Sequence, residues 1–236
     1  MIIQSDFPAL FPNNFFFPGP SFRDAPGIFQ YGAFCVLSHV FMKKIFFLIL
    51  AIMAVSCKQD PRQAVLDNIM TRTSVRAYTA EPVSDTDVQI LLKAAMAAPS
   101  AKNRQPWEFI VVNERQILDS LAGKLRYAKM LAEVPLAIVI CAHTFQEGPD
   151  GALKPNGYWE HDASAACENL LLAAHALGLG AVWTAASDEE RSAIVREVLR
   201  LRAGISPLCV VPIGHPAENP VPKDKWKPEK IHYNRW

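Results

Sequence analysis

Two arginines and a serine occupy alternate positions in the segment Arg72-Thr73-Ser74-Val75-Arg76. Alternate side chains of an extended chain project to the same side, so Arg72, Ser74 and Arg76 would together form a small anion-binding cradle. Guanidinium groups present forked N–H donors that match phosphate oxygens, and a serine hydroxyl adds a neutral donor. Taken alone, the segment is explained equally well as a solvated basic turn.

A second cluster of polar side chains lies between Pro99 and Trp107 and contains Ser100, Asn103 and Gln105. An amide side chain combines a donor with an acceptor, as the pyrimidine ring of a flavin requires. The alternative is a loop whose polar side chains bind its own backbone. The cluster by itself leaves both interpretations open.

The hydrophobic pattern predicts the elements that position these two clusters. We expect helices over residues 61–70, 85–97, 116–121, 162–177 and 188–199, with N-terminal caps at Ser84 and Ser187. Strands are expected over residues 107–112, 136–141, 181–184 and 208–213, with the strand at 136–141 in the centre of the sheet. Residues 143–159 are expected to form a long loop. Helices mixed with four or five strands predict a layered helix–sheet–helix domain.

Charge and cysteine usage exclude several classes of function. Residues 58–236 carry 21 basic and 21 acidic side chains, once the three basic and two acidic residues before them are removed from the totals of 24 and 23. This balance provides no basic face, so we expect no nucleic-acid partner. Cys141, Cys167 and Cys209 lie in apolar stretches without C-x-x-C spacing and are expected to be buried free thiols. The histidines lack metal-ligand spacing, so we expect no metal site.

The first 57 residues differ from the rest of the chain. Residues 1–41 hold nine of the thirteen phenylalanines and only three charges, and we expect them to be an upstream extension without a fold. Residues 42–57 have the layout of an export signal, with two lysines, an apolar run and Ser56-Cys57. The run from 45 to 55 would rise only about 16 Å as a helix, too short for a hydrocarbon core of about 30 Å.

The end of that segment, Ala54-Val55-Ser56-Cys57, resembles a bacterial lipobox, which implies lipidation of Cys57. The domain at 58–236 would then be attached to the membrane only through a lipid anchor. This interpretation places the protein in the cell envelope, on the periplasmic or surface side. Without a functional signal the protein would be cytoplasmic.

Four motifs, taken together, resemble the nitroreductase family in identity and order. They are Arg72-Thr73-Ser74-Val75-Arg76, the loop from Pro99 to Trp107, Gly178-Leu179-Gly180-Ala181-Val182-Trp183-Thr184 and Ile213-Gly214-His215-Pro216. The resemblance implies an α+β homodimer with a three-layer helix/sheet/helix fold, a mixed sheet and FMN at the subunit interface. Hydride would pass from NAD(P)H through flavin N5 to a nitroaromatic, a quinone or a similar small acceptor. No catalytic side chain is implied, because the flavin carries the chemistry.

The resemblance also implies which residues contact the cofactor. Arg72, Ser74 and Arg76 would hold the phosphate and ribityl end and approach the pyrimidine ring. Lys225 or Lys227 would add positive charge at the phosphate. The isoalloxazine would be contacted by Pro99, Ser100, Asn103 and Gln105, some of them from the partner subunit, and by Trp183, Thr184, Ala185 and Ala186 near N5.

The predicted location raises a question about the electron donor, because NAD(P)H is a cytoplasmic compound. Three explanations are open. Either the anchor interpretation is wrong, or the electrons come from another donor, or the exported protein catalyses a different reaction. The alternative function is an exported flavin-binding lipoprotein with no NAD(P)H turnover. A third alternative is a domain that keeps the fold without binding flavin.

Overall fold

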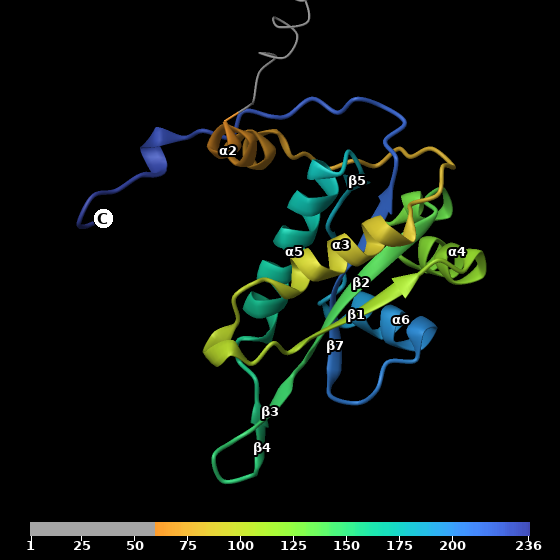
Figure 1. The fold of residues 1–236 in the computed structure, drawn as a ribbon. Coiled ribbons are helices and arrows are strands. Elements are labelled where there is room, and N and C mark those ends of the chain that lie inside the picture. The colour runs from red at the N-terminus through yellow and green to blue at the C-terminus, as the bar shows by residue number, and fades with distance from the viewer. Residues whose placement is uncertain (1–59) are drawn as a thin grey trace, which may run out of the picture. The chain divides into compact units, whose positions relative to one another are not determined.

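The computed structural model describes residues 60–236 (Figure 1). The predictions for residues 1–41, for the signal segment 42–57 and for lipidation of Cys57 lie outside the described residues. Within residues 60–236, no helix has the length and hydropathy that crossing a bilayer would demand.

Five strands of the described chain form one sheet, whose three long members lie side by side in Figure 1. The strands are β1 (Trp107–Val112), β2 (Leu136–His143), β5 (Gly180–Ala181), β6 (Thr184–Ala185) and β7 (Ile205–Gly214). Their order is β1-β2-β7-β5, and β6 pairs with β7 as well. Because β2 lies between β1 and β7, the central position predicted for residues 136–141 is confirmed.

All pairs in this sheet are antiparallel, so the predicted mixed sheet is wrong for residues 60–236. The connection between β1 and β2 illustrates the reason. Val112, at the end of β1, pairs with Ala137, near the start of β2, so the connecting chain leaves and rejoins the sheet at the same end. Such a connection joins antiparallel neighbours. The hydrophobic pattern contains no information about strand direction.

The helices predicted from the sequence are all present, with ends shifted by a few residues. They are α2 (Pro61–Thr71), α3 (Asp85–Met96), α4 (Arg115–Lys124), α5 (Trp159–Ala176) and α6 (Glu189–Leu199), and short 3-10 turns cover Ala101–Asn103, Lys129–Ala132 and Pro228–Lys230. The Ser84 cap of α3 is confirmed, because its hydroxyl accepts the Asp87 N–H at 3.0 Å. The Ser187 cap of α6 is wrong by one residue, because the Asp188 carboxylate accepts the Arg191 N–H instead.

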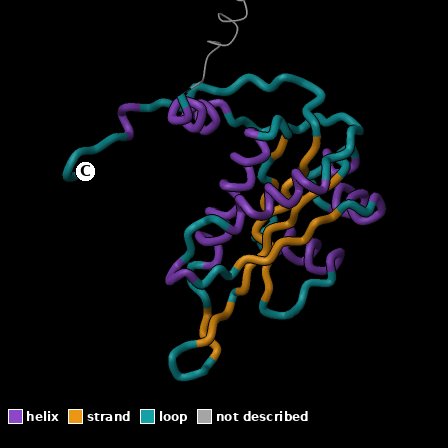
Figure 2. Tube along the Cα trace, viewed as in Figure 1, coloured by secondary structure: helices purple, strands orange, loops and turns teal. Residues whose placement is uncertain are grey.

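Alternate residues of β2 face opposite sides of the sheet and so build two cores. Ile138 and Ile140 pack with α3 and α5. Val139 and Cys141 pack on the other face with α4 and α6. Figure 2 shows the strands between these two sets of helices. The predicted three-layer helix/sheet/helix arrangement is therefore confirmed.

The strand predicted over residues 181–184 is interrupted and appears as β5 and β6. Both halves follow one register along β7, in which Ala181 faces Ile213 and Thr184 faces Val210. This register places Val182 opposite Pro212, which has no N–H to donate to the ladder. The interruption follows from that missing donor.

The predicted loop over residues 143–159 contains a two-stranded hairpin that sequence periodicity did not indicate. Its strands are β3 (Phe145–Glu147) and β4 (Leu153–Pro155), and its tip extends away from the sheet in Figure 1. Phe145 and Leu153 are exposed, so the hairpin buries little of its own apolar surface. Its position must therefore be fixed by other contacts.

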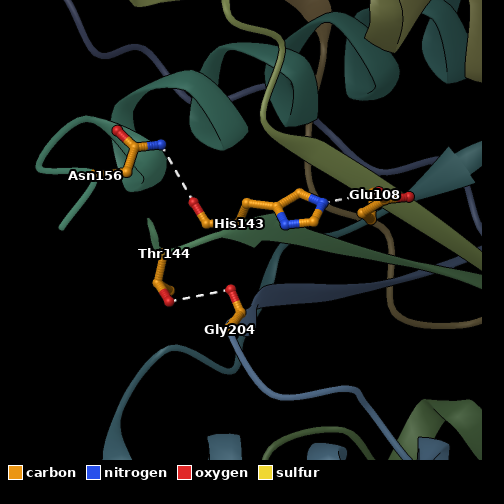
Figure 3. Close-up of polar contacts among 5 residues, drawn as sticks. All are labelled: Glu108, His143, Thr144, Asn156 and Gly204. Atoms are coloured by element: carbon orange, nitrogen blue, oxygen red, sulfur yellow. Dashed lines mark hydrogen bonds and ion pairs between the residues drawn. The ribbon is translucent and has the colours of Figure 1, made fainter. Parts of the chain in front are cut away.

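Polar contacts fix the base of this hairpin (Figure 3). The buried Asn156 amide donates to the His143 carbonyl oxygen at 3.2 Å, and the Thr144 hydroxyl donates to the Gly204 carbonyl oxygen at 3.1 Å. The His143 Nε2 atom lies 3.0 Å from a carboxylate oxygen of Glu108 in β1. The hairpin is thus held by β1 on one side and by the turn before β7 on the other.

Candidate functional site

The segment from Arg72 to Arg76 lies against β5. The Val75 N–H donates to the Ala181 carbonyl oxygen at 3.1 Å, and the Val75 side chain is buried. Gly180 permits this close approach, because a Cβ atom at that position would lie 2.7 Å from Val75 Cγ1. The glycine that precedes the Ala181-Val182-Trp183-Thr184 motif therefore positions the arginine-rich segment.

Tyr78 fixes the same segment from its other end. Its hydroxyl donates to the Val75 carbonyl oxygen at 2.6 Å, and the ring is buried beside Gly214. Burial raises the pKa of Tyr78, so the phenol remains protonated and continues to donate. Val75 is therefore held through its N–H, its side chain and its carbonyl oxygen.

The polar side chains of the segment have different surroundings. The Arg72 side chain is mostly buried, and its Nε atom lies 3.6 Å from a Glu168 carboxylate oxygen in α5. Within residues 60–236, neither the Ser74 hydroxyl nor the Arg76 guanidinium has a hydrogen-bond or ion-pair partner. Two donors of the predicted cradle are therefore available to an anion, and the third is held against α5.

The charge of Arg72 also affects His175, near the C-terminal end of α5. The His175 Nε2 atom lies 2.9 Å from the Thr71 hydroxyl. Burial and, secondarily, the positive charge of Arg72 lower the pKa of His175. The neutral imidazole is thus favoured next to the segment, and the positive charge there comes from arginine.

One cavity brings together residues from two of the motifs. It has a volume of about 470 Å³, and its lining includes Arg76, Trp183, Thr184 and Ala185 together with Tyr127, Met130, Val182 and Arg191. The pairing of β6 with β7 holds Thr184 and Ala185 in place. Arg191 is also bonded to Asp188, whereas Arg76 brings an uncompensated positive charge. An apolar indole and a guanidinium therefore meet in a space large enough for part of a flavin.

Ala186 occupies a different position from its three predecessors. It is completely buried in the core between the sheet and α4 and α6. Its N–H donates to the Leu208 carbonyl oxygen at 2.8 Å. Ala186 therefore supports the wall of the cavity from behind and offers a ligand no exposed surface.

The loop that begins at Pro99 has an unusual backbone. Lys102, Asn103 and Gln105 all have positive φ angles, of 56°, 53° and 51°, in the region that residues other than glycine rarely adopt. Backbone strain of this kind costs about 1–3 kcal/mol per residue and concentrates at functional sites. The side chains of all three are exposed. The loop thus holds polar groups at the surface in an unfavourable conformation.

Three hydrogen bonds that involve side chains help to maintain that conformation. The Gln105 N–H donates to the Ser100 hydroxyl at 2.9 Å, and the Gln105 amide donates to the Asn103 side-chain oxygen at 3.1 Å. The Ala101 N–H donates to the carboxylate of Asp162 at 2.8 Å, and Asp162 is only 5% exposed. Ser100 therefore serves the loop's own backbone, while Asn103 and Gln105 each keep further donors or acceptors at the surface.

The loop and the arginine segment do not share the cavity within one chain. The loop contacts the first turn of α5 through Asp162, whereas Arg72 contacts Glu168, six residues later and about 9 Å further along the helix. Figure 1 places the loop at the end of α3 that lies away from the segment 72–76. The two groups of predicted flavin contacts therefore lie apart on the surface of a single subunit.

The two predicted lysines lie in the C-terminal tail, and both are exposed. Lys225 lines a second cavity of about 520 Å³ together with Ile69, Met70 and Trp226. Lys227 precedes the 3-10 turn at Pro228–Lys230 and is absent from the lining of that cavity. Lys225 is thus the lysine that lies beside α2, the helix leading into Arg72.

Sequence reasoning missed the residues that hold the site in place. Tyr78 and Asp162 contact backbone atoms of the two predicted clusters, and Gly180 was recognised as part of a motif but not as a contact of Val75. Asp162 gave a usable signal, because a carboxylate on the apolar face of a helix requires a buried partner. Tyr127, Met130 and Arg191 line the cavity but are 50 or more residues from Arg76 in the sequence, so no local pattern connects them.

This chain is similar in sequence and in fold to known proteins. The chain matches the model of the nitroreductase family over residues 69–128 and 119–215. It is 39% identical over 173 residues to a Methanothermobacter thermautotrophicus protein named "Putative NADH dehydrogenase/NAD(P)H nitroreductase", covering 73% of this chain and 87% of that protein. The crystal structure of a Bacteroides thetaiotaomicron protein of the same name is 46% identical, with a TM-score of 0.68, and covers 73% of this chain and 98% of that one.

A third relative carries its cofactor in its name. The structure of an "FMN-dependent Nitroreductase" from Clostridium difficile R20291 is 31% identical, with a TM-score of 0.64, and covers 72% of this chain and 99% of that one. The matched family region includes the arginine segment, the loop after Pro99 and the strands β5 and β6. The family predicted from the four motifs is confirmed, and this chain belongs to the nitroreductase family.

Proposed function

We propose that this chain is an FMN-dependent oxidoreductase that transfers electrons from NAD(P)H to a nitroaromatic, a quinone or a similar small acceptor. The observation that carries the proposal is the cavity in which Arg76 meets Trp183, Thr184 and Ala185. Two residues before Arg76, the Ser74 hydroxyl has no hydrogen-bond partner among residues 60–236. The names of its relatives, which include NAD(P)H nitroreductases and an FMN-dependent nitroreductase, support both the enzyme class and the cofactor.

The donor set of this site suits FMN. When bound, FMN supplies two-electron transfer between NAD(P)H and the acceptor. Ser74 and Arg76 offer donors to the ribityl, phosphate and pyrimidine oxygens, and the Trp183 indole forms an apolar wall that excludes water from one side of the cavity. Tyr78 and Gly180 hold the segment that carries these donors, so they contribute by positioning.

The proposed enzyme is a homodimer whose sites combine residues of both subunits. The helix α2 has no buried residue, and its apolar side chains Val65, Leu66, Ile69 and Met70 are 50–77% exposed. Trp226 of the tail is exposed as well and lines a cavity together with Ile69 and Met70. A contiguous apolar surface of this kind favours association. A second copy would cover it and bring the loop at 99–105 to the cavity of its partner.

The proposed location remains the cell envelope, with attachment through a lipid on Cys57. Its support is the signal layout of residues 42–57. A variant of the proposal follows from that location, in which the exported protein binds flavin but does not react with NAD(P)H. Mass spectrometry of the native N-terminus tests the location, since a lipidated Cys57 supports it and a peptide from residues 1–41 contradicts it.

Anaerobic titration of the purified full-length protein tests the function. The protein is first saturated with FMN, and flavin absorbance is followed as NADH or NADPH is added. We expect the flavin to lose its colour with at least one nicotinamide and to recover it when a nitroaromatic or a quinone is added. The Arg202→Ala variant is the control and should behave as the wild type does, because this exposed arginine lies outside the cavity.

Two other outcomes separate the alternatives. Flavin that stays bound and coloured with either nicotinamide would replace the reductase proposal with the flavin-binding lipoprotein. A colourless protein that takes up no added FMN would overturn both.

A further inference from the structure

Two cysteines lie in contact inside the core although 42 positions separate them in the sequence. The Sγ atoms of Cys167 in α5 and Cys209 in β7 are 3.5 Å apart, and both residues are completely buried. Cys141 packs in the core on the opposite face of the sheet. Among the three cysteines of residues 60–236, the pair in contact is therefore Cys167 and Cys209.

This pair joins the elements that support the two groups of predicted flavin contacts. Cys209 is opposite Ala185, a residue of the cavity lining, in the pairing of β6 with β7. The helix α5, which contains Cys167, holds the loop at 99–105 through Asp162. A covalent bond between the two sulfurs would fix these supporting elements to each other.

We propose that Cys167 and Cys209 form a disulfide when the chain folds in the presence of a disulfide oxidant. The thiolate of one cysteine attacks the oxidant's disulfide, forms a mixed disulfide and releases one oxidant thiol. The thiolate of the second cysteine then attacks the sulfur of the first, forms the Cys167–Cys209 bond and releases the second oxidant thiol. Two cysteine thiols are oxidised, one oxidant disulfide is reduced, and the two cysteine protons pass to the released thiols.

The packing around the pair permits this bond. A disulfide has an S–S length of about 2.0 Å, so the sulfurs must approach each other by about 1.5 Å. The buried face of α5 contains Ala163, Ala166 and Ala174, and these small side chains allow the helix to lie close to the sheet. The gap between the sulfurs would close through a movement of the helix or of the cysteine rotamers.

Burial determines when the reaction takes place. Desolvation and the hydrogen bond with Cys167 raise the pKa of the Cys209 thiol well above its ordinary value, so little thiolate exists in the folded core. Oxidants also cannot reach a completely buried sulfur. The bond must therefore form during folding or local opening, which an exported chain undergoes in an oxidising compartment.

Peptide mapping of the full-length protein tests the proposal. The protein is unfolded under reducing conditions, refolded with a mixture of oxidised and reduced glutathione, alkylated in denaturant and digested with trypsin and a Glu-specific protease. Cleavage after Glu147 and Glu160 separates Cys141 from Cys167. We expect a linked pair of peptides that contains Cys167 and Cys209, 2 Da lighter than the two free thiol peptides together.

Denaturation provides a second measurement on the same samples. We expect the denaturant midpoint of the oxidised protein to fall when dithiothreitol is added, because the cross-link restricts the unfolded chain. Cys141→Ser should retain this response, whereas Cys167→Ser and Cys209→Ser should lose it. Full alkylation of Cys167 and Cys209 in the refolded wild type overturns the proposal, as does a link to Cys141. Neither measurement depends on flavin, so its result is independent of the proposed enzyme activity.

Discussion

The hydroxyl of Tyr78 donates to the carbonyl oxygen of Val75, three residues earlier, across a distance of 2.6 Å. Both residues are buried, and Val75 lies between Ser74 and Arg76, whose side chains remain exposed enough to meet a ligand. A hydrogen bond inside the core thus determines where two surface donors point. The site is therefore sensitive to substitutions that never touch the cofactor.

The Tyr78→Phe substitution tests this relationship. It removes the hydroxyl while keeping the ring, and the buried Val75 carbonyl loses a donor, which costs about 1–3 kcal/mol. We expect a lower free energy of unfolding in urea and weaker FMN binding by fluorescence titration. Tyr233→Phe, at a residue that is 82% exposed, is the control and should change neither. Unchanged FMN affinity in Tyr78→Phe would contradict the positioning role.

The contact between Gly180 and Val75 predicts a steric effect. A Cβ atom in Gly180→Ala would approach Val75 Cγ1 to 2.7 Å, so the core must shift at a typical overpacking cost of about 1–3 kcal/mol. Gly123→Ala in α4 is the matched control, since nothing lies within 4 Å of its Cβ position. That control should be neutral or stabilise the helix by up to about 1 kcal/mol. Thermal unfolding of the two variants should therefore shift in opposite directions, or by clearly different amounts.

Removal of the arginines should weaken FMN binding. A charge-assisted hydrogen bond contributes about 1.5–3 kcal/mol, so Arg76→Ala should raise the Kd for FMN by roughly 10- to 100-fold. Arg72→Ala should raise it less, because Arg72 is also held by Glu168. Arg72→Ala should also lower stability, because it leaves Glu168 without its partner. Equilibrium dialysis measures the affinity, with Arg202→Ala as the control. Wild-type affinity in both variants would show that the anion cradle is misplaced.

Substitution of Asp162 should lower the free energy of unfolding. Asp162→Ala leaves the Ala101 N–H without its acceptor, which costs about 1–3 kcal/mol, whereas Asp162→Asn keeps a side-chain oxygen in reach. We expect the alanine variant to be the less stable of the two in urea. Glu160→Ala, at an exposed position two residues earlier, controls for loss of charge at the helix start. Equal stability of all three variants would exclude the proposed support of the loop.

His175 predicts a pH dependence of stability. Its pKa in the folded protein is lower than the ordinary 6.5, because of burial and then Arg72. Above 6.5 both folded and unfolded states hold a neutral imidazole, so the contribution to stability is complete. As pH falls below 6.5, the unfolded state binds the proton first, and stability decreases. Urea unfolding between pH 7.5 and 5 should show this decrease in the wild type and a smaller one in His175→Gln.

Much of the fold was predictable because it depends on local patterns. The helix α3 and the strand β1 have periodicities and flanking residues that mark their ends, and the Ser84 cap was identified correctly. The interruption between β5 and β6 could not be predicted, because it depends on which residue faces Val182 across the sheet. Strand direction and the hairpin at Phe145 likewise depend on contacts between distant segments.

The candidate site, too, was predictable from the sequence only in part. The sequence indicated the motif around Arg76 and the motif at Trp183 separately. They share a cavity only because the fold places the segment 72–76 against β5. The residue that fixes the loop, Asp162, is 61 positions from Ala101. Residue type and spacing therefore indicated which chemical groups the site contains, but the tertiary fold determines which of them meet.

The anchored base of the β3–β4 hairpin has a consequence for how this protein can diversify. Contacts of His143, Thr144 and Asn156 fix both ends of the hairpin, so the tip from 148 to 151 can gain or lose residues without displacing β2 or α5. Exposed tips of this kind accept insertions readily. Duplicated genes could therefore acquire new tips on an unchanged core, and a recombinant tag or a labelling peptide can be inserted at the same place.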